Sequence, residues 1–305
     1  MADAPATGSA SPTLLIDGSS LAYRAYHAIP VLTAPDGTAT NAVHGFLGFL
    51  SRLLPDRRPA RLFVALDADW RPAFRVEALP EYKAHRVAKE GDEPDPVEPQ
   101  IALIVEILGA FGISTARCEG YEAEDAIAAI ATRSTGPVEV VTGDRDLFAL
   151  VRHPHVRVLY TLRGVSELAP VDQAWIAAKY GIPGDRYMDY AIMRGDPSDG
   201  LPGVAGIGEK TASELLRKYG SLDAILAAAD LSPTIRARIH KGEGYIASAR
   251  RVVALAEDCA VECGDGSIRA QPADAARLAA LAERLAIAGP VERLTAALRV
   301  ASVTR

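Results

Sequence analysis

Nine carboxylate side chains lie in five short motifs of this 305-residue chain. They are Asp17 in LLIDGSS, Asp67 in LFVALDA, Glu122, Glu124 and Asp125 in YEAED, Asp144 and Asp146 in VVTGDRD, and Asp196 and Asp199 in GDPSD. Clustered carboxylates repel one another unless cations lie between them, and hard divalent ions such as Mg²⁺ or Mn²⁺ prefer oxygen ligands. The motifs therefore predict a metal site, provided that the fold brings them together.

Three of these motifs share one form, an apolar run that ends in aspartate. In a parallel sheet such runs are buried strands, and their C-terminal ends open onto one crevice. We therefore expect Asp17, Asp67 and Asp144 to converge. Each of them alone is explained equally well as the N-cap of the following helix, and only the three together favour the crevice.

The acidic residues of YEAED begin a predicted helix. Acidic residues in a first turn also complement the helix dipole. Alternatively, Glu122 and Asp125 share one face, and Glu124 reaches the crevice. Asp144 and Asp146 fall on one side of the TGDRD turn if that turn is extended.

Alternating strands and helices must position these residues. Apolar runs predict strands at 13–17, 61–68, 112–118, 138–143 and 156–161. Helical patterns lie at 19–29, 42–54, 101–112, 121–134 and 144–151. The alternation fades near residue 170, and the rest is mainly helical, with a boundary expected near Gly184.

The charged, proline-rich segment 70–100 interrupts this alternation. It carries five basic residues interleaved with two aromatic ones, namely Arg71, Arg75, Lys83, Arg86, Lys89, Phe74 and Tyr82. This pattern suits phosphates and stacked bases, although a merely solvated loop is the alternative. Its position directly after Asp67 favours the functional interpretation.

The stretch GDPSDGLPGVAGIGEKTA contains closely spaced glycines. A phosphate-binding P-loop requires lysine directly after its last glycine, but Glu209 intervenes here and no apolar strand precedes. The pattern fits a helix–hairpin–helix turn better. Gly203, Gly206 and Gly208 would let the backbone approach a nucleic-acid phosphate at the next helix start, with Lys210 adding charge.

The bulk properties are compatible with DNA binding. The net charge is −6, and setting aside the nine clustered negative charges leaves +3 on the remaining residues. Three cysteines, Cys118, Cys259 and Cys263, are an odd number, so we expect buried free thiols. No apolar run reaches about 18 residues, and residues 1–12 lack a signal-peptide pattern. We expect those twelve residues to be a disordered tail of a cytoplasmic protein.

Taken together, the motifs resemble the 5′-nuclease (flap endonuclease) superfamily. The nearest match is the 5′→3′ exonuclease domain of bacterial DNA polymerase I and its stand-alone relatives. The matching motifs, in chain order, are LLIDGSSLAYRAYHAIP, FRVEALPEYKAHR, YEAEDAIA, VTGDRDLFALV and GDPSDGLPGVAGIGEKTA. They span residues 14 to about 220, and the chain looks like the free-standing form.

The resemblance implies two domains. An α/β, PIN-like or resolvase-like parallel-sheet nuclease core would occupy residues 13–183, with a helical arch at about 70–100. An all-α, SAM-fold-like DNA-binding domain would occupy residues 184–305, with its helix–hairpin–helix motif at about 200–219.

The resemblance also implies roles for individual residues. Asp17, Asp67, Glu122 and Glu124 would surround a first metal, and Asp144, Asp146, Asp196 and Asp199 a second, with Asp125 close by. Lys83 and Arg86 would be the catalytic cations near the scissile phosphate, and Tyr82 would stack on a base. The expected DNA contacts are Arg24, Tyr82, Gly203, Gly206, Gly208, Lys210 and Thr211. The cofactors would be two or three Mg²⁺ or Mn²⁺ ions, with K⁺ on the hairpin carbonyls.

These features predict a structure-specific, metal-dependent 5′→3′ exonuclease and 5′-flap endonuclease. Its substrates would be DNA 5′ ends, flaps or junctions in replication and repair. We expect a monomer associated with the nucleoid and linked functionally to a DNA polymerase and a ligase. A non-catalytic DNA-structure-binding relative is the alternative, but the complete carboxylate set favours the enzyme. A toxin-like endoribonuclease would leave residues 184–305 unexplained.

Two departures from the family pattern stand out. Gly200 occupies a position where relatives usually carry Asn, which would alter the turn near Asp199. The segment VAKEGDEPDPVEPQ is longer and more acidic than the usual connector, which would change how the arch closes.

Overall fold

A seven-stranded sheet forms the centre of the protein in a computed structural model, which describes residues 11–89 and 91–303. The strand order is β6-β5-β4-β1-β2-β3-β7. The strands are β1 (Thr13–Asp17), β2 (Arg61–Ala65), β3 (Ser114–Arg117), β4 (Val138–Thr142), β5 (Val156–Arg163), β6 (Glu167–Val171) and β7 (Glu262–Cys263). Residues 1–10 of the expected tail lie outside the described residues.

The first five strands are parallel and lie where the apolar runs predict them. The antiparallel edge strands β6 and β7 were not predicted. β6 contains Pro170, which suits an edge, and both residues of β7 are exposed. Neither strand has the continuous apolar run that marks a buried strand.

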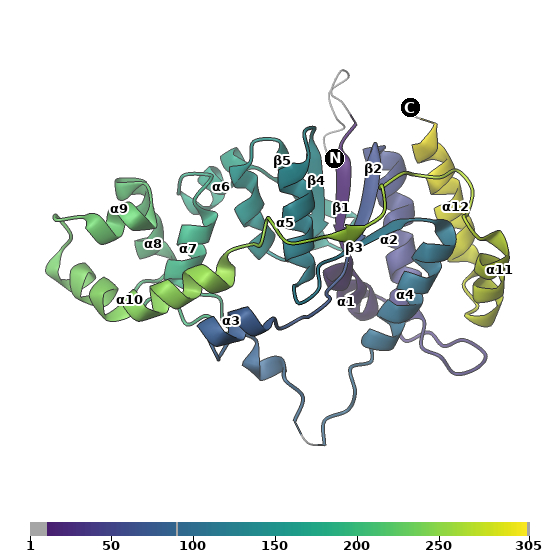
Figure 1. The fold of residues 1–305 in the computed structure, drawn as a ribbon, viewed down its shortest axis with the longest axis horizontal. Coiled ribbons are helices and arrows are strands. Elements are labelled where there is room, and N and C mark those ends of the chain that lie inside the picture. The colour runs from purple at the N-terminus through teal and green to yellow at the C-terminus, as the bar shows by residue number, and fades with distance from the viewer. Residues whose placement is uncertain (1–10, 90, 304–305) are drawn as a thin grey trace.

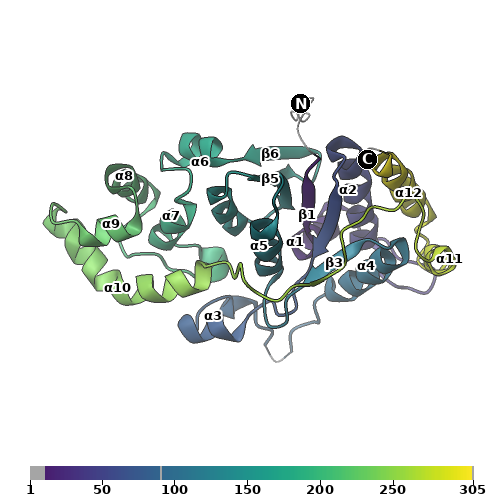
Figure 2. The same cartoon turned by 45° about the horizontal axis from the view of Figure 1, so that its top comes forward.

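Helices cover both faces of the sheet (Figures 1 and 2). On one face, Leu14 and Ile16 of β1 belong to an apolar core shared with α1 (Gly18–Ala28), α2 (Asn41–Arg57) and α4 (Glu98–Phe111). On the other face, Leu15 belongs to a core shared with α5 (Ala123–Arg133). Successive β1 residues thus enter different cores, as the period-two geometry of a strand requires.

The segment after β4 differs from its prediction. Residues 144–151 were expected to form an α-helix, but Asp146–Arg152 form a 3₁₀ helix, η2. Residues 147–151 are all buried, so they carry no one-sided apolar pattern that distinguishes the two helix types.

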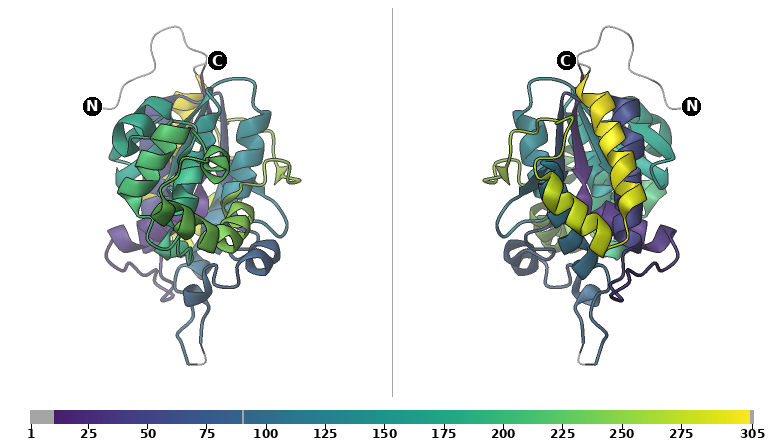
Figure 3. Two further views of the ribbon diagram at one scale, coloured as in Figure 1. Left: turned by 90° about the vertical axis from the view of Figure 1, so that its left-hand side faces the viewer. Right: turned by 90° about the vertical axis from the view of Figure 1, so that its right-hand side faces the viewer.

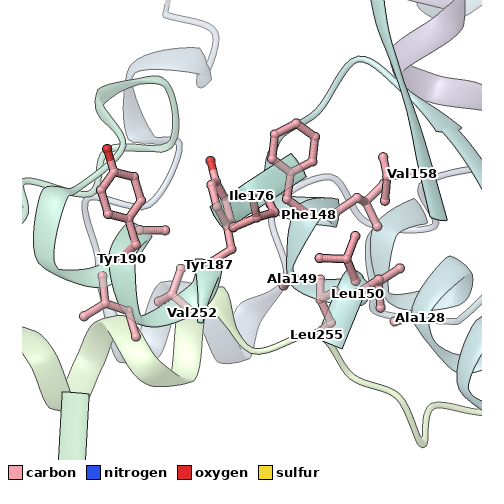
Figure 4. Packing of buried hydrophobic residues seen from close by; sticks show 14 of the residues in the cluster. Ala128, Phe148, Ala149, Leu150, Val158, Ile176, Tyr187, Tyr190, Val252 and Leu255 are labelled. Atoms are coloured by element: carbon pink, nitrogen blue, oxygen red, sulfur yellow. The ribbon is translucent and has the colours of Figure 1, made fainter. Parts of the chain in front are cut away.

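The helical half continues from the sheet without a break in the core. It contains α6 (Gln173–Tyr180), α7 (Tyr187–Arg194), η3 (Pro197–Asp199), α8 (Glu209–Tyr219), α9 (Leu222–Ala227) and α10 (Pro233–Val253). In Figure 4, Phe148 of η2 lies near Tyr187 of α7, with Val252 of α10 alongside. The Phe148 and Tyr187 ring centroids are 5.2 Å apart.

The last two helices do not join the helical half, which corrects the expected extent of the second domain. α11 (Ala275–Arg284) packs on α4, and α12 (Ala288–Ser302) packs on α2. Figure 2 shows both helices at the opposite end of the molecule from α8 and α9. Their leucines complete the core over α2 and α4, a long-range pairing that Ala/Leu-rich helical patterns do not specify. The boundary near Gly184 stays a prediction.

Residues 254–274 connect these two ends by crossing beside β3, where β7 pairs with that strand. Here Cys118 and Cys259 form a disulfide with a Cα–Cα distance of 6.3 Å, and Cys263 is an exposed free thiol. The expectation of three buried free thiols is therefore wrong. The two bonded cysteines are 141 residues apart, so only the path of the returning chain brings them together.

The interrupting segment 70–100 contains α3 (Ala73–Ala78) and the 3₁₀ helix η1 (Ala84–Arg86). α3 packs against α10, Lys83 bonds the backbone of Asp199 just before η1, and the chain on either side of residue 90 projects from the body of the molecule (Figure 3). Along the described residues, no helix is both long and apolar enough to cross a membrane.

Candidate active site

The strand register places Asp17, Asp67 and Asp144 at the same end of three adjacent strands. Asp17 pairs with Ala65, two residues before Asp67, and Ile16 pairs with Val141, three residues before Asp144. Because β1, β2 and β4 are neighbouring parallel strands, the three aspartates lie at the same edge of the sheet.

The alternative explanation, that each aspartate caps the helix after it, holds for Asp17 but not for Asp67 or Asp144, because the N-caps of α3 and η2 are Pro72 and Arg145. Asp17 Oδ1 accepts a hydrogen bond from Ser20 N at 3.1 Å at the start of α1, and its Oδ2 accepts from Thr142 Oγ1 at 2.6 Å. Asp67 Oδ1 accepts from Ala123 N at 2.8 Å. The bond made by Asp67 fixes the start of α5, and with it the YEAED carboxylates, against the end of β2.

The YEAED carboxylates surround one arginine of the arch. Glu122 is the N-cap of α5, and its N–H donates to Asp125 Oδ2 at 3.2 Å. The Arg75 guanidinium bonds Glu122 and lies 2.8 Å from both Glu124 Oε1 and Asp125 Oδ1. Glu122 also accepts from Lys83 Nζ and, at 2.6 Å, from the Tyr82 hydroxyl.

These contacts correct part of the expected arch. Arg75 is 0% exposed and Tyr82 is 2% exposed, so neither faces a solvent-filled channel. Arg71 donates to the carbonyls of Tyr82 at 2.6 Å and Pro80 at 2.7 Å, bracing the arch. The prediction that Arg71 and Arg75 present charge to phosphates is wrong for this arrangement. Stacking by Tyr82 would require the arch to move.

The two aspartates of the GDPSD motif lie at the ends of η3, where Asp196 is the N-cap and Asp199 is the last residue. Asp199 Oδ1 is 2.8 Å from Arg86 Nη2. Asp196 Oδ2 is 3.0 Å from Arg194 Nη2 and 3.6 Å from Arg145 Nη2. Basic side chains from three parts of the chain therefore pair with these two carboxylates.

Gly200 explains how the arch reaches this turn. Lys83 N donates to Asp199 O at 3.0 Å. Gly200 has a φ of +76°, and a Cβ there would lie 2.3 Å from the carbonyl oxygen of Glu81. The positive φ and the close approach of the two backbones therefore favour glycine at this position.

The carboxylates influence one another's protonation. Burial, reinforced by Asp144 and Asp67, raises the pKa of Asp17 to about 7 although the Thr142 hydroxyl opposes the shift. Burial and the nearby Asp199 raise the pKa of Asp144. Burial, Asp144 and Asp199 likewise raise the pKa of Asp146. Aspartates from four motifs therefore share one electrostatic environment.

Glu122, Glu124 and Asp125 form an acidic trio at the start of α5. For Glu122 and Glu124, nearby cations counter the rise in pKa that burial causes. Burial raises the pKa of Glu122, against the opposing charges of Lys83 and Arg75. Burial also raises the pKa of Glu124, where Arg75 is the main opposing charge. Such crowding of buried carboxylates is typical of sites that hold cations.

The side chains are arranged around protein cations. Within residues 11–89 and 91–303, no three carboxylate, histidine or cysteine side chains are grouped so that they could hold a metal ion as they stand. Arg75, Lys83 and Arg86 occupy carboxylate oxygens instead. The side chains at this end of the strands nonetheless offer many carboxylate oxygens. Such hard ligands suit Mg²⁺ or Mn²⁺.

The glycine-rich turn follows Asp199 closely in the sequence and precedes α8. Gly203 and Gly206 have φ values of +73° and +82°. Gly208 is the N-cap of α8 and provides no side-chain cap, so the first N–H groups of this helix have no capping side chain, and Lys210 beside them is exposed. Thr211 is half-buried in the same turn.

Arg24, also expected at the DNA, contacts a different part of the site. Its Nη2 donates to the carbonyl of Gly143 at 3.0 Å. A Cβ at Gly143 would lie 1.7 Å from Arg24 Nε, so the glycine makes room for the guanidinium. Arg24 therefore braces the turn that carries Asp144.

Sequence reasoning missed three residues that hold the carboxylates. These are Thr142 beside Asp17, Arg194 beside Asp196, and Arg75 as the common partner of the YEAED residues. Arg194 lies two residues before Asp196, a proximity that could have indicated the pair. Nothing in the local sequence indicates the contacts of Arg75, because its partners lie about 50 residues away.

Comparison with known proteins identifies the family. The family described as "5′-3′ exonuclease, N-terminal resolvase-like domain" matches residues 12–181, and "5′-3′ exonuclease, C-terminal SAM fold" matches residues 182–276. The chain belongs to the 5′-3′ exonuclease family. A 5′-3′ exonuclease of Streptomyces coelicolor is 48% identical over 92% of this chain and 98% of its own length.

Two further comparisons place this exonuclease among longer and more distant proteins. DNA polymerase I of Mycobacterium tuberculosis is 39% identical over 90% of this chain, which covers 30% of the polymerase. A bacteriophage T5 flap endonuclease, solved with DNA and metal ions, has a TM-score of 0.62 at 16% identity and covers 95% of this chain and 99% of its own. These comparisons confirm the predicted α/β core with a SAM-fold domain, and the predicted 5′-3′ exonuclease activity.

Proposed function

We propose that this exonuclease hydrolyses DNA phosphodiesters at 5′ ends, flaps and junctions with two divalent ions held by the strand-end carboxylates. The observation that carries this proposal is the strand register, which places Asp17, Asp67 and Asp144 at the same end of three adjacent parallel strands although Asp17 and Asp144 are over 120 residues apart in sequence. Family membership and the DNA and metal ions in the solved T5 relative support it.

The carboxylates divide by position. One ion would be held by Asp17, Asp67, Glu122 and Glu124, and a second by Asp144, Asp146, Asp196 and Asp199. The same division would apply if a third ion binds. Bound Mg²⁺ or Mn²⁺ activates a water and stabilises the attacking and leaving oxygens of the phosphodiester. Asp125 has both oxygens engaged, by Arg75 and Ala256 N at one and Glu122 N at the other, so we assign it a supporting role.

Lys83 and Arg86 would act on the substrate phosphate. In the present arrangement they pair with Glu122 and Asp199. With divalent ions held by those carboxylates, Lys83 and Arg86 would turn toward the scissile phosphate and stabilise its developing charge. These two ion pairs hold the arch in its present position, and the same two cations are proposed to act on the phosphate.

The preference for frayed or displaced ends follows from access to the carboxylates. A nucleotide in a duplex must leave the stack to reach them, which costs a few kcal/mol and costs least at a displaced strand. The turn at Gly203 and Gly206, the N–H groups that begin α8, Lys210 and Thr211 would bind the duplex backbone. K⁺ on the hairpin carbonyls belongs to this proposal, although Gly206 O already accepts from Arg238 Nη1 at 2.9 Å.

The cellular setting follows from the substrate. We propose a monomer that works at the nucleoid, in the cytoplasm, on ends left by replication and repair. A DNA polymerase and a ligase would supply and consume such ends, because a removed flap leaves a gap or a nick.

A labelled 5′-flap DNA tests the proposal. The protein is incubated with Mg²⁺, Mn²⁺ or EDTA beside Asp144→Asn, whose side chain is nearly isosteric but uncharged. Metal-dependent cleavage near the flap junction that the variant loses is the expected result. Tight flap binding without cleavage in either metal would favour the non-catalytic structure-binding alternative.

A further inference from the structure

Arg75 is a buried cation enclosed by carboxylates at the root of the arch. Its side chain is 0% exposed, and its guanidinium reaches three different acidic residues. It lies between the rings of Phe74 and Tyr82, with its guanidinium carbon 5.3 and 5.9 Å from their centroids. A guanidinium is always charged and presents several donors in a rigid fork, so one side chain can orient several carboxylates at once.

The other cations of the cluster are placed differently. The side chain of Arg86 is 42% exposed, and that of Lys83 is 10% exposed at the rim of the arch. Arg86 can turn away from its carboxylate toward solvent, and Lys83 keeps a small exposed part of its side chain. Arg75 has no such path, and separating it from its partners would leave a buried charge unpaired, which is strongly unfavourable.

The bonds of Arg75 also determine which oxygens stay available. It engages Oε1 of Glu124 and leaves Oε2 of that residue outside the ion pair. It shares Oδ1 of Asp125 with Ala256 N, while Asp125 Oδ2 accepts from Glu122 N. The guanidinium therefore completes a rigid frame around Glu122 and Glu124 that does not depend on a metal.

We propose that Arg75 is a positioning residue, a permanent counter-ion that holds Glu122 and Glu124 ready for the divalent ion and stays when Lys83 and Arg86 leave. This inference rests on the proposed function of the carboxylates. Arg75 belongs to α3 and its partners to the start of α5. The same contacts therefore tie the arch root to the carboxylates, and arch placement and ligand orientation change together.

The test uses two substitutions and a matched control. Arg75→Gln removes the charge, and Arg75→Lys keeps the charge but loses the fork. Arg57→Gln is the control, because Arg57 Nε forms a similarly buried pair with Glu139 at 3.0 Å, near the opposite end of β4 from Asp144. Mn²⁺ binding to the metal-free protein is measured by calorimetry, and kcat and KM for the flap DNA are measured separately.

A positioning role predicts that both Arg75 variants lose about tenfold or more in Mn²⁺ affinity and in kcat, with KM little changed. Arg57→Gln should show the wild-type values in its folded fraction. Wild-type Mn²⁺ affinity and kcat in the Arg75 variants would overturn the inference, and so would tighter binding in Arg75→Gln, since Arg75 would then merely compete with metal. If the wild-type protein itself fails to cleave the flap, the proposed function has failed instead.

Discussion

Asp17 illustrates the conflict between stability and function at the level of single residues. It is 6% exposed, caps α1 and accepts a hydrogen bond from Thr142, yet it lies close to Asp67 and Asp144. Keeping such groups together costs stability unless protons or cations neutralise them. The fold accepts this cost at the edge where the nuclease chemistry is proposed.

This conflict gives a pH prediction. The pKa of Asp17 is raised from 3.8 to about 7 in the folded protein. The folded state therefore keeps a proton that the unfolded chain releases, and the stabilisation present at low pH is lost as the pH rises through about 7. In EDTA, the free energy of unfolding should fall between pH 5 and pH 8, by up to about 1.4 kcal/mol per pH unit for each proton kept.

Asp17→Asn tests the assignment, because asparagine retains an oxygen for Ser20 N and carries no charge. Urea unfolding should show a smaller loss of stability between pH 5 and pH 8, and a variant more stable than wild type at pH 8. The exposed Asp56→Asn on α2 is the control and should follow wild type. An unchanged pH dependence in Asp17→Asn would contradict the assignment.

At the level of elements, the arch is docked on the turn that carries Asp199. The backbone bond from Lys83 N to Asp199 O and the contact of Gly200 with Glu81 hold the two segments together. A side chain at Gly200 cannot fit without separating them. The arch position thus depends on one residue that is remote from it in sequence.

Gly200→Asn should release the arch from this turn. We expect faster cleavage of the arch in limited proteolysis without DNA, and a loss of about 1–3 kcal/mol in stability. Gly220→Asn is the matched control, since Gly220 has a similar φ of +86° but no atom within 4 Å of an added Cβ. Equal proteolysis of the two variants would show that backbone strain, rather than the lost contact, determines the result.

At the level of the whole molecule, the chain segment after α10 ties the helical half to the core. Ala256 N donates to Asp125, and Glu257 pairs with Arg152 at 2.5 Å. The disulfide between Cys118 and Cys259 joins the same segment to the end of β3. These contacts lie between the acidic trio and the helices that carry the glycine-rich turn.

Reduction should therefore destabilise the whole protein. The loss expected for a native disulfide is about 2–5 kcal/mol. Urea unfolding with and without dithiothreitol measures it, and Cys118→Ser should match the reduced protein. Cys263→Ser should leave stability unchanged because that thiol is free and exposed. Equal stability of the oxidised and reduced wild-type protein would contradict a structural role for the bond.

DNA binding should depend strongly on salt, since the proposed contacts are mainly to phosphates. If about six phosphates are neutralised, affinity should fall roughly a thousandfold between about 50 and 200 mM salt. Fluorescence anisotropy with a flap DNA in Ca²⁺ measures this dependence. A nearly flat affinity over that range would count against the binding mode.

The sequence predicted the parts of this molecule whose signals are local. The apolar runs ending in Asp17, Asp67 and Asp144 specified parallel strands, and the ordered motifs specified the family. It did not predict Arg75 inside the acidic trio, the pairing of Cys118 with Cys259, or α12 on α2. Each of these depends on contacts between segments at least about 50 residues apart, which a local pattern does not encode.

The most direct measurement is the anomalous scattering of Mn²⁺ in crystals of the exonuclease, at a concentration that supports flap cleavage. We predict one peak among the carboxylates of Asp17, Asp67, Glu122 and Glu124 and another among those of Asp144, Asp146, Asp196 and Asp199, with Lys83 withdrawn from Glu122 and Arg75 still in place. Density elsewhere, or none between these carboxylates while Lys83 remains on Glu122, would contradict the proposed metal site.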